Sequence, residues 1–100
     1  MKRLWSVFTD DMEHCIETGT PYCHRHHIFG ASNRNKSEKR GFVIPLAFDL
    51  HEFGADSIHE NPNEGLDLKW KQMAQMYYEE HYGTRQDFRK EFGKSYLEEE

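Results

Sequence analysis

Four histidines supply the chemistry that this sequence offers. His26, His27, His51 and His59 each stand at an expected strand end or helix turn near a glycine. Histidine is the commonest metal ligand in proteins, because its neutral imidazole offers a lone pair at physiological pH. Side chains at the ends of strands and helices can converge without filling a core. We therefore expect these four residues to form a site built around a divalent metal ion.

The adjacent residues His26 and His27 are expected to have different functions. Successive side chains on a strand point to opposite faces, so the two imidazoles cannot serve one purpose. Hydrolysis of a phosphodiester needs such a division. A cation must neutralise the charge that develops on the phosphate, and a separate base must take a proton from the attacking water. An imidazole with an ordinary pKa of about 6.5 can act as that base near neutral pH.

The other three histidines carry weaker signals. His14 and His81 have no partner nearby in the sequence, and we expect them to be structural or surface residues. His24 should share a strand face with His26, because side chains two residues apart point the same way. It is therefore a candidate for contact with the metal ligands or with a phosphate.

Short strands and a loop are expected to hold the histidine pair. Apolar and β-branched runs predict strands at 4–8, 14–18, 23–29 and 42–46, with Pro45 ending the last one or placing it at an edge. The stretch 30–41, rich in Ser and Asn and bounded by Gly, is typical of a loop. A short helix that begins near Pro45 and ends at Gly54 should then carry His51.

Two helices are expected after the histidines. From Asn63 as N-cap to Gly83, the residues Leu66, Trp70, Met73 and Tyr77 recur at helical spacing and predict a buried face. Thr84 and Asp87 have the spacing of a capping box for a last helix that ends at Gly93. These elements make one α+β domain over residues 1–100, with a core at 13–60 and C-terminal helices at 63–97.

Composition places the chain among folded proteins without a membrane segment. Its 100 residues are 14% aromatic, which supplies large buried side chains at few positions. No apolar run approaches the roughly 20 residues that span a bilayer, and the N-terminal segment turns acidic before a secretory signal could form. We therefore expect a cytoplasmic protein. In a reducing compartment, Cys15 and Cys23 are expected to be free thiols.

The basic residues gather around the histidine pair although the net charge is -5. Between Pro21 and Ile44 there is one acid, Glu38. The bases of this window are candidates for contacts with a DNA backbone: Arg25, Arg34, Lys36, Lys39 and Arg40.

The segments "RHHIFG", "FVIPLAFDLH" and "SIHENP", taken in this order, resemble the HNH endonucleases of the ββα-metal (His-Me finger) superfamily, in particular small phage and prophage proteins. The resemblance covers residues 13–60, and the C-terminal helices are also similar. It implies a ββα-metal finger with an N-terminal strand and C-terminal helices. It further implies a metal-dependent DNA endonuclease encoded by a phage or prophage in a bacterial host. Low sequence specificity is expected because contacts to the phosphate backbone carry no sequence information, and the acidic remainder of the chain suggests a phage or host protein as a partner.

The resemblance assigns a role to each candidate residue. His26, His51 and His59 would be the metal ligands, and His27 would be the general base. Asn33 is the candidate for the Asn that orients the base in this family.

Two points remain open at the level of sequence. Many relatives hold a structural zinc with CxxC pairs, but here Thr18, Ala47 and Leu50 stand at three of the four positions, so that zinc is expected to be absent. The catalytic ion could be Zn, Ni, Co, Mn or Mg, since availability decides among them. The alternative function is a non-catalytic binding module in phage assembly or regulation, in which the histidines hold a structural metal.

Overall fold

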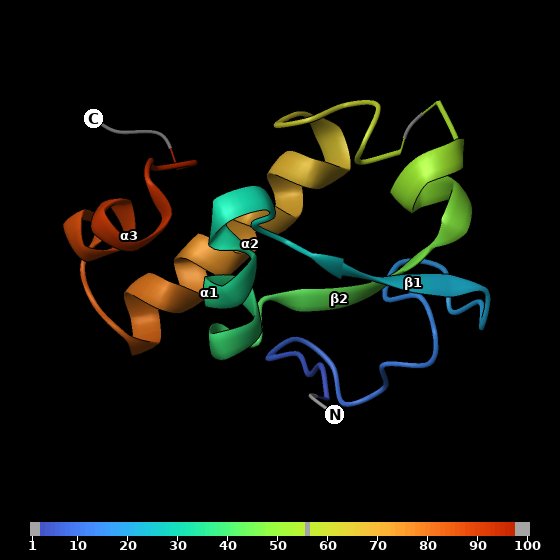
Figure 1. Cartoon of the computed structure of the whole chain (residues 1–100), viewed down its shortest axis with the longest axis horizontal. Coiled ribbons are helices and arrows are strands. Elements are labelled where there is room, and N and C mark those ends of the chain that lie inside the picture. Colours follow the sequence, from blue (N-terminus) through green and yellow to red (C-terminus); the bar gives the residue numbers. More distant parts are fainter. Residues whose placement is uncertain (1–2, 56, 98–100) are drawn as a thin grey trace.

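Two antiparallel strands, joined through a short helix and followed by two further helices, form the protein (Figure 1). The structure is a computed structural model that describes residues 3–55 and 57–97. Strand β1 (Cys23–His27) pairs antiparallel with β2 (Val43–Ala47), and the helices are α1 (Arg34–Arg40), α2 (Gly65–His81) and α3 (Arg85–Phe92). A 3-10 turn at Ala31–Asn33 precedes α1, and a π-helical turn at Asp49–Phe53 follows β2. The expected α+β class is confirmed, and the arrangement is consistent with a ββα unit.

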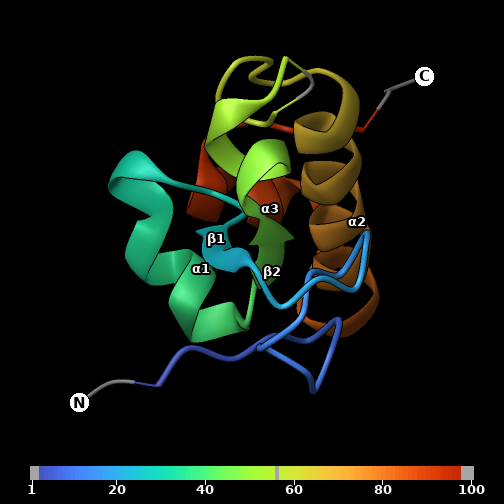
Figure 2. The ribbon, with the colours of Figure 1, turned by 90° about the vertical axis from the view of Figure 1, so that its right-hand side faces the viewer.

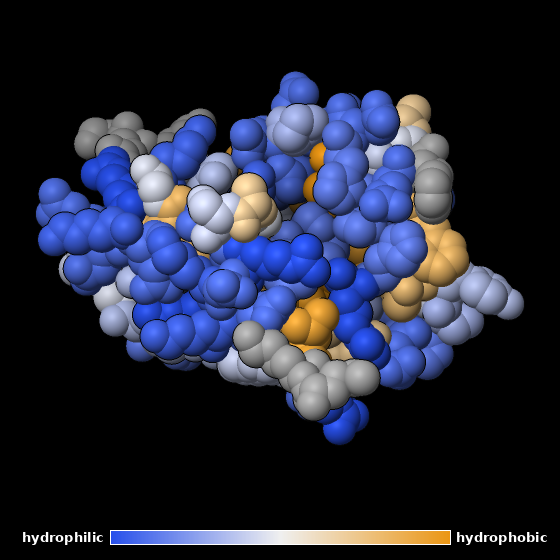
Figure 3. Space-filling model, in the orientation of Figure 1, coloured by the Kyte–Doolittle hydropathy of each residue, from blue (hydrophilic) through white to orange (hydrophobic). Residues whose placement is uncertain are grey.

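The strand pair lies between two helices. Seen along the strands, α1 lies on one side of the pair and α2 on the other (Figure 2). Every residue of β2 is buried. Its apolar side chains join a core with Phe29, Trp70 and Phe88, in which aromatic rings contact one another at their edges. On the face drawn in Figure 3, hydrophobic residues form only small separate patches in a mainly hydrophilic surface.

The segment before β1 differs from the prediction. Strands were expected at 4–8 and 14–18, but in the described part of the chain neither range forms one. Isolated backbone bonds hold this segment instead: Val7 N–H donates to the Gly41 carbonyl and Ile16 N–H donates to the Pro45 carbonyl, both at 2.9 Å. A strand needs a continuous ladder of such bonds, and single contacts leave the chain in turns.

The stretch 30–41 is also different from the prediction, because most of it is helix α1 instead of loop. Its sequence after Asn33 contains no Gly or Pro before Gly41, and Lys, Arg and Glu have good helix propensity. Gly41 ends the helix in the left-handed conformation, with φ of 75°. The Ser and Asn content therefore gave a misleading signal, since these residues mark caps and turns as well as loops.

The C-terminal helices agree with the prediction except at one cap. Thr84 and Asp87 form the expected capping box of α3, and each side chain accepts a hydrogen bond from the other residue's backbone N–H. The N-cap of α2 is Glu64 and not Asn63. Asn63 adopts φ of 61°, and its N–H donates to the Asp67 carboxylate at 2.6 Å. Of the predicted face of α2, Trp70 is buried, and Leu66, Met73 and Tyr77 are only partly buried against the core.

Hydrogen bonds link α1 to α3. The guanidinium of Arg40 donates to both carboxylate oxygens of Glu91, at 2.9 and 2.8 Å, and Lys36 donates to the carbonyl of the same residue. Asn33 donates to the Phe92 carbonyl at 2.8 Å. Within the described residues, no helix has both the length and the apolar character that a membrane crossing needs.

Candidate metal centre and adjoining pocket

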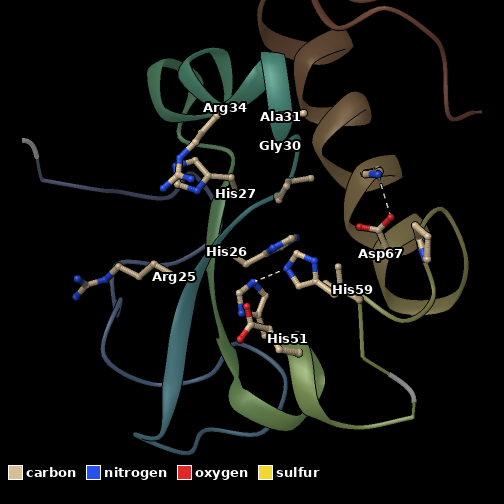
Figure 4. Close-up of a pocket in the computed structure, with 14 residues that line it drawn as sticks. Arg25, His26, His27, Gly30, Ala31, Arg34, His51, His59 and Asp67 are labelled. Atoms are coloured by element: carbon tan, nitrogen blue, oxygen red, sulfur yellow. Dashed lines mark hydrogen bonds and ion pairs between the residues drawn. The ribbon is translucent and has the colours of Figure 1, made fainter.

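A pocket of about 460 Å³ opens beside the C-terminal end of β1. Its walls come from β1, the turn that follows it, the π-helical turn, the segment 58–62 and the start of α2. All four candidate histidines line this pocket: His26, His27, His51 and His59. Polar side chains therefore converge here from parts of the chain that are far apart in sequence (Figure 4).

Three of these histidines form a group that could hold a metal ion. One ring nitrogen each of His26, His51 and His59 lies within 4.8 Å of the others, and the Nε2 atoms of His51 and His59 are 3.1 Å apart. Figure 4 shows the three rings turned toward one another. The segment carrying His59 returns to the π-helical turn through backbone bonds, Ile58 N–H to the Leu50 carbonyl at 2.7 Å and His59 N–H to the His51 carbonyl at 3.3 Å. These bonds bring together two histidines that are eight residues apart.

The environment of His26 fits a metal ligand. Its side chain is buried, and its Nε2 atom has no hydrogen-bond partner among the residues that the structure describes. Burying an imidazole nitrogen without a partner costs free energy, and a metal ion bound to its lone pair would remove that cost. The residues present thus fit a divalent cation with imidazole ligands.

Protonation would not block these ligands at neutral pH. Burial, together with positive charge on the neighbouring His51 and His59, lowers the pKa of His26 to about 3. Burial likewise lowers the pKa of His51 to about 4, with a further contribution from His59. Both rings are therefore neutral near pH 7, which leaves a lone pair on each ring for a metal.

His27 has a different partner from the metal group. Its Nε2 atom lies 2.7 Å from Oε2 of Glu38 on α1, and both side chains are largely buried. Asn33, expected to orient this histidine, instead donates its amide to α3 at the Phe92 carbonyl. Its position at the start of α1 puts it in contact with α3, whereas Glu38, one helical turn beyond Arg34, lies beside His27. Glu38 was missed because the stretch 30–41 was predicted to be a loop.

The five candidate DNA contacts have different surroundings. Lys36 and Arg40 are engaged with Glu91, so they serve packing between α1 and α3. Arg34 and Arg25 both line the pocket. Arg34 is 66% exposed, and the Arg25 guanidinium is directed away from the histidines and pairs with Glu13 at 2.7 Å (Figure 4).

Lys39, the fifth candidate, and Lys71, which was not among the candidates, differ in their exposure. Lys39 is exposed on α1. Lys71 of α2, which sequence reasoning missed, lines the pocket and pairs with Asp67 at 2.9 Å. The spacing of these two residues, one helical turn apart on the expected helix, was the signal that could have found the pair.

The remaining candidates lie outside the pocket. Cys15 and Cys23 are free thiols, as expected. His14 is exposed and bonds to the Asp11 carboxylate, and His81 is exposed at the end of α2 with its ring 4.2 Å from that of Tyr77. Both are surface residues, as predicted.

No family model, curated protein or solved structure matches this chain. The functional proposal accordingly depends on the geometry of the pocket and on the motif resemblance.

Proposed function

We propose that this protein is a metal-dependent DNA endonuclease of the HNH type. The observation that supports the proposal best is the separation of two imidazole functions at one strand end. His26 belongs to the group of three histidines. The adjacent His27 contacts Glu38 instead and lies outside that group. Metal-assisted hydrolysis needs this pair of functions, and both histidines line the same pocket.

His26, His51 and His59 would hold the ion. A divalent cation there would neutralise the charge that develops on the scissile phosphate and on the leaving 3' oxygen. Within the described residues, this group contains three ligands. Structural sites close with four protein ligands, whereas catalytic sites keep a position open for water or substrate. A three-histidine set therefore favours hydrolysis over a purely structural metal.

His27 would act as the general base. A carboxylate that accepts the Nε2 proton fixes the tautomer in which Nδ1 carries the lone pair. Glu38 is therefore assigned as the positioning residue, in place of Asn33. Because it holds the proton on one nitrogen, it leaves the other free to take a proton from the attacking water.

Arg34 is placed to contact the phosphate backbone near this site, because it is exposed and lines the same pocket. Lys71 lines the same pocket from α2, but its charge is paired with Asp67, so Arg34 would be the main contact to an anion. Contacts of this kind position the substrate without reading its sequence, so the nuclease should have low sequence specificity.

The test is nicking of supercoiled plasmid by the metal-free protein after addition of Mg, Mn, Co, Ni or Zn, with EDTA as the blank. We expect metal-dependent nicking. His27→Ala should lower its rate by about 100-fold or more, which is the usual contribution of a general base, while metal affinity stays unchanged. His14→Ala, at an exposed histidine outside the pocket, is the matched control and should cut like the parent.

Glu38→Gln tests the positioning role separately. It should lower the cleavage rate by at least about tenfold at unchanged metal affinity, because the neutral amide no longer holds the required tautomer. Glu38→Asp should recover part of that loss. Undiminished nicking by His27→Ala would rule out His27 as the general base. Tight stoichiometric metal binding by the parent without nicking would favour the non-catalytic binding module.

A further inference from the structure

His51 lies between two polar partners, one at each ring nitrogen. Its Nε2 atom faces Nε2 of His59 at 3.1 Å, within the group that includes His26. Its Nδ1 atom faces Nδ1 of His24 at 2.9 Å. The second contact belongs to another group whose ligand atoms all lie within 4.8 Å of one another: His24, His51 and Glu52.

We propose that His24, His51 and Glu52 form a second cation site, which competes with the site of His26, His51 and His59 for the ring of His51. This inference rests on the metal site of the proposed function, but it does not depend on DNA cleavage.

The donor set suits a divalent metal. Two imidazoles and one carboxylate occur in catalytic zinc sites and in non-heme iron sites. Two nitrogens bound to one ion at about 2.0–2.1 Å stand roughly 2.9 Å apart at a right angle and roughly 3.4 Å apart at the tetrahedral angle. The 2.9 Å separation of the His24 and His51 nitrogens falls at the first of these values, so the rings need little movement. The ring of His24 also packs on Phe48, with centroids 4.3 Å apart, which restricts its orientation.

Competition follows from the chemistry of imidazole. A neutral ring has one nitrogen with a lone pair and one that carries a proton. When Nε2 of His51 binds the ion of the first site, its Nδ1–H donates to His24. When Nδ1 binds the ion of the second site, its Nε2–H donates to His59. In each state, the metal ion binds at one of the two contacts, His51–His59 or His24–His51, and the other contact is a hydrogen bond. One chain therefore holds one ion.

The two sites should differ in metal preference. Three imidazoles favour Zn, Co and Ni, whereas a carboxylate oxygen favours a harder ion such as Mn. Zinc is therefore expected mainly at the site with His26 and His59, and manganese should shift the balance toward His24 and Glu52.

Equilibrium dialysis of the metal-free chain against Zn or Mn, with the bound metal quantified, tests the competition. The parent should bind one equivalent. His59→Ala removes a ligand of the first site alone, at an exposed position, and should still bind one equivalent. Adding Glu52→Gln to His59→Ala should weaken that binding by at least tenfold. Adding Glu60→Gln instead, at the exposed acid next to His59 in the sequence, should leave it unchanged. In the parent background, Glu52→Gln should weaken Mn binding at least tenfold and Zn binding less than threefold.

The outcomes separate this inference from the proposed function. Two equivalents bound by the parent would overturn the competition. Loss of all binding in folded His59→Ala, or unchanged affinity when Glu52→Gln is added to it, would overturn the second site. If that happened while the parent still bound metal and nicked DNA, the proposed function would stand. If the parent bound one ion at these sites but never nicked DNA, the competition between the two sites would stand and the proposed endonuclease function would be wrong.

Discussion

Replacing His26 by glutamine should change how the stability of the metal-free chain depends on pH. The folded chain keeps this buried ring neutral because its pKa is lowered to about 3. The unfolded chain binds a proton at the same ring below its ordinary pKa of about 6.5. Unfolding therefore takes up a proton between these two values, and the free energy of unfolding falls as the pH is lowered through this window. Glutamine binds no proton in either state, so the variant lacks this contribution.

The size of the effect follows from the two pKa values. In the window between them, one such group changes the free energy of unfolding by about 1.4 kcal/mol per pH unit. Lowering the pH from about 7.5 to about 5 should cost the parent roughly 2 kcal/mol more than it costs the variant. For a domain of this size, that corresponds to a difference in Tm of roughly 8–16 °C.

Urea unfolding in EDTA buffer, followed by far-UV circular dichroism at several pH values, measures this difference. His26→Gln can differ from the parent at pH 7.5 through altered packing, so the change of that difference with pH is the informative quantity. His14→Gln, at an exposed ring, should follow the parent throughout. A difference between parent and His26→Gln that stays constant from pH 7.5 to 5 would refute the assignment of His26 as a buried neutral ring.

Two further predictions test how the pocket is built. Arg34→Ala should reduce the salt dependence of DNA binding by about one unit in log K against log[salt] without lowering Tm, while Arg40→Ala should lower stability on the order of 1 kcal/mol and leave that salt slope unchanged. Gly41→Ala should destabilise the fold by about 1–2 kcal/mol in urea unfolding, because φ there is 75° and an added Cβ would lie 2.7 Å from the Trp5 ring. Gly30→Ala, where nothing lies within 4 Å of the added atom, should change stability by less than about 0.5 kcal/mol. Equal salt slopes for the two arginine variants, or equal stability of the two glycine variants, would contradict these assignments.

The two strands and the last two helices could be predicted because their signals are local. Apolar runs bounded by turn residues mark β1 and β2, and the spacing of Leu66 and Trp70 marks α2. Helix α1 could not be predicted in this way. Its polar sequence allows helix or loop, and its bonds to α3 involve residues more than 50 positions away.

The same contrast holds for the candidate site. His26, His51 and His59 are recognisable from residue type and order, and the structure brings their rings together. His24 was a candidate because it shares a strand face with His26, but the identity of its partner, and the role of Glu38, depend on the geometry of neighbouring elements. Glu38 reaches His27 because α1 is a helix, and His24 meets His51 because the π-helical turn directs that ring toward β1. Such partners are specified by tertiary structure, which a short sequence window does not contain.

The two sides of β1 are supported by different parts of the chain. On the metal side, the segment carrying His59 is fixed by backbone bonds to the π-helical turn. On the other side, the Ser37 hydroxyl on α1 donates to the Phe29 carbonyl at 2.7 Å and accepts from the Phe29 N–H at 3.0 Å, which fixes the helix two residues beyond His27. Bonds from α1 to α3 add a second support for Glu38. Changes at the contact between α1 and α3 should therefore act on the base and spare the metal, so that the proposed general base and the proposed metal ligands can be perturbed one at a time.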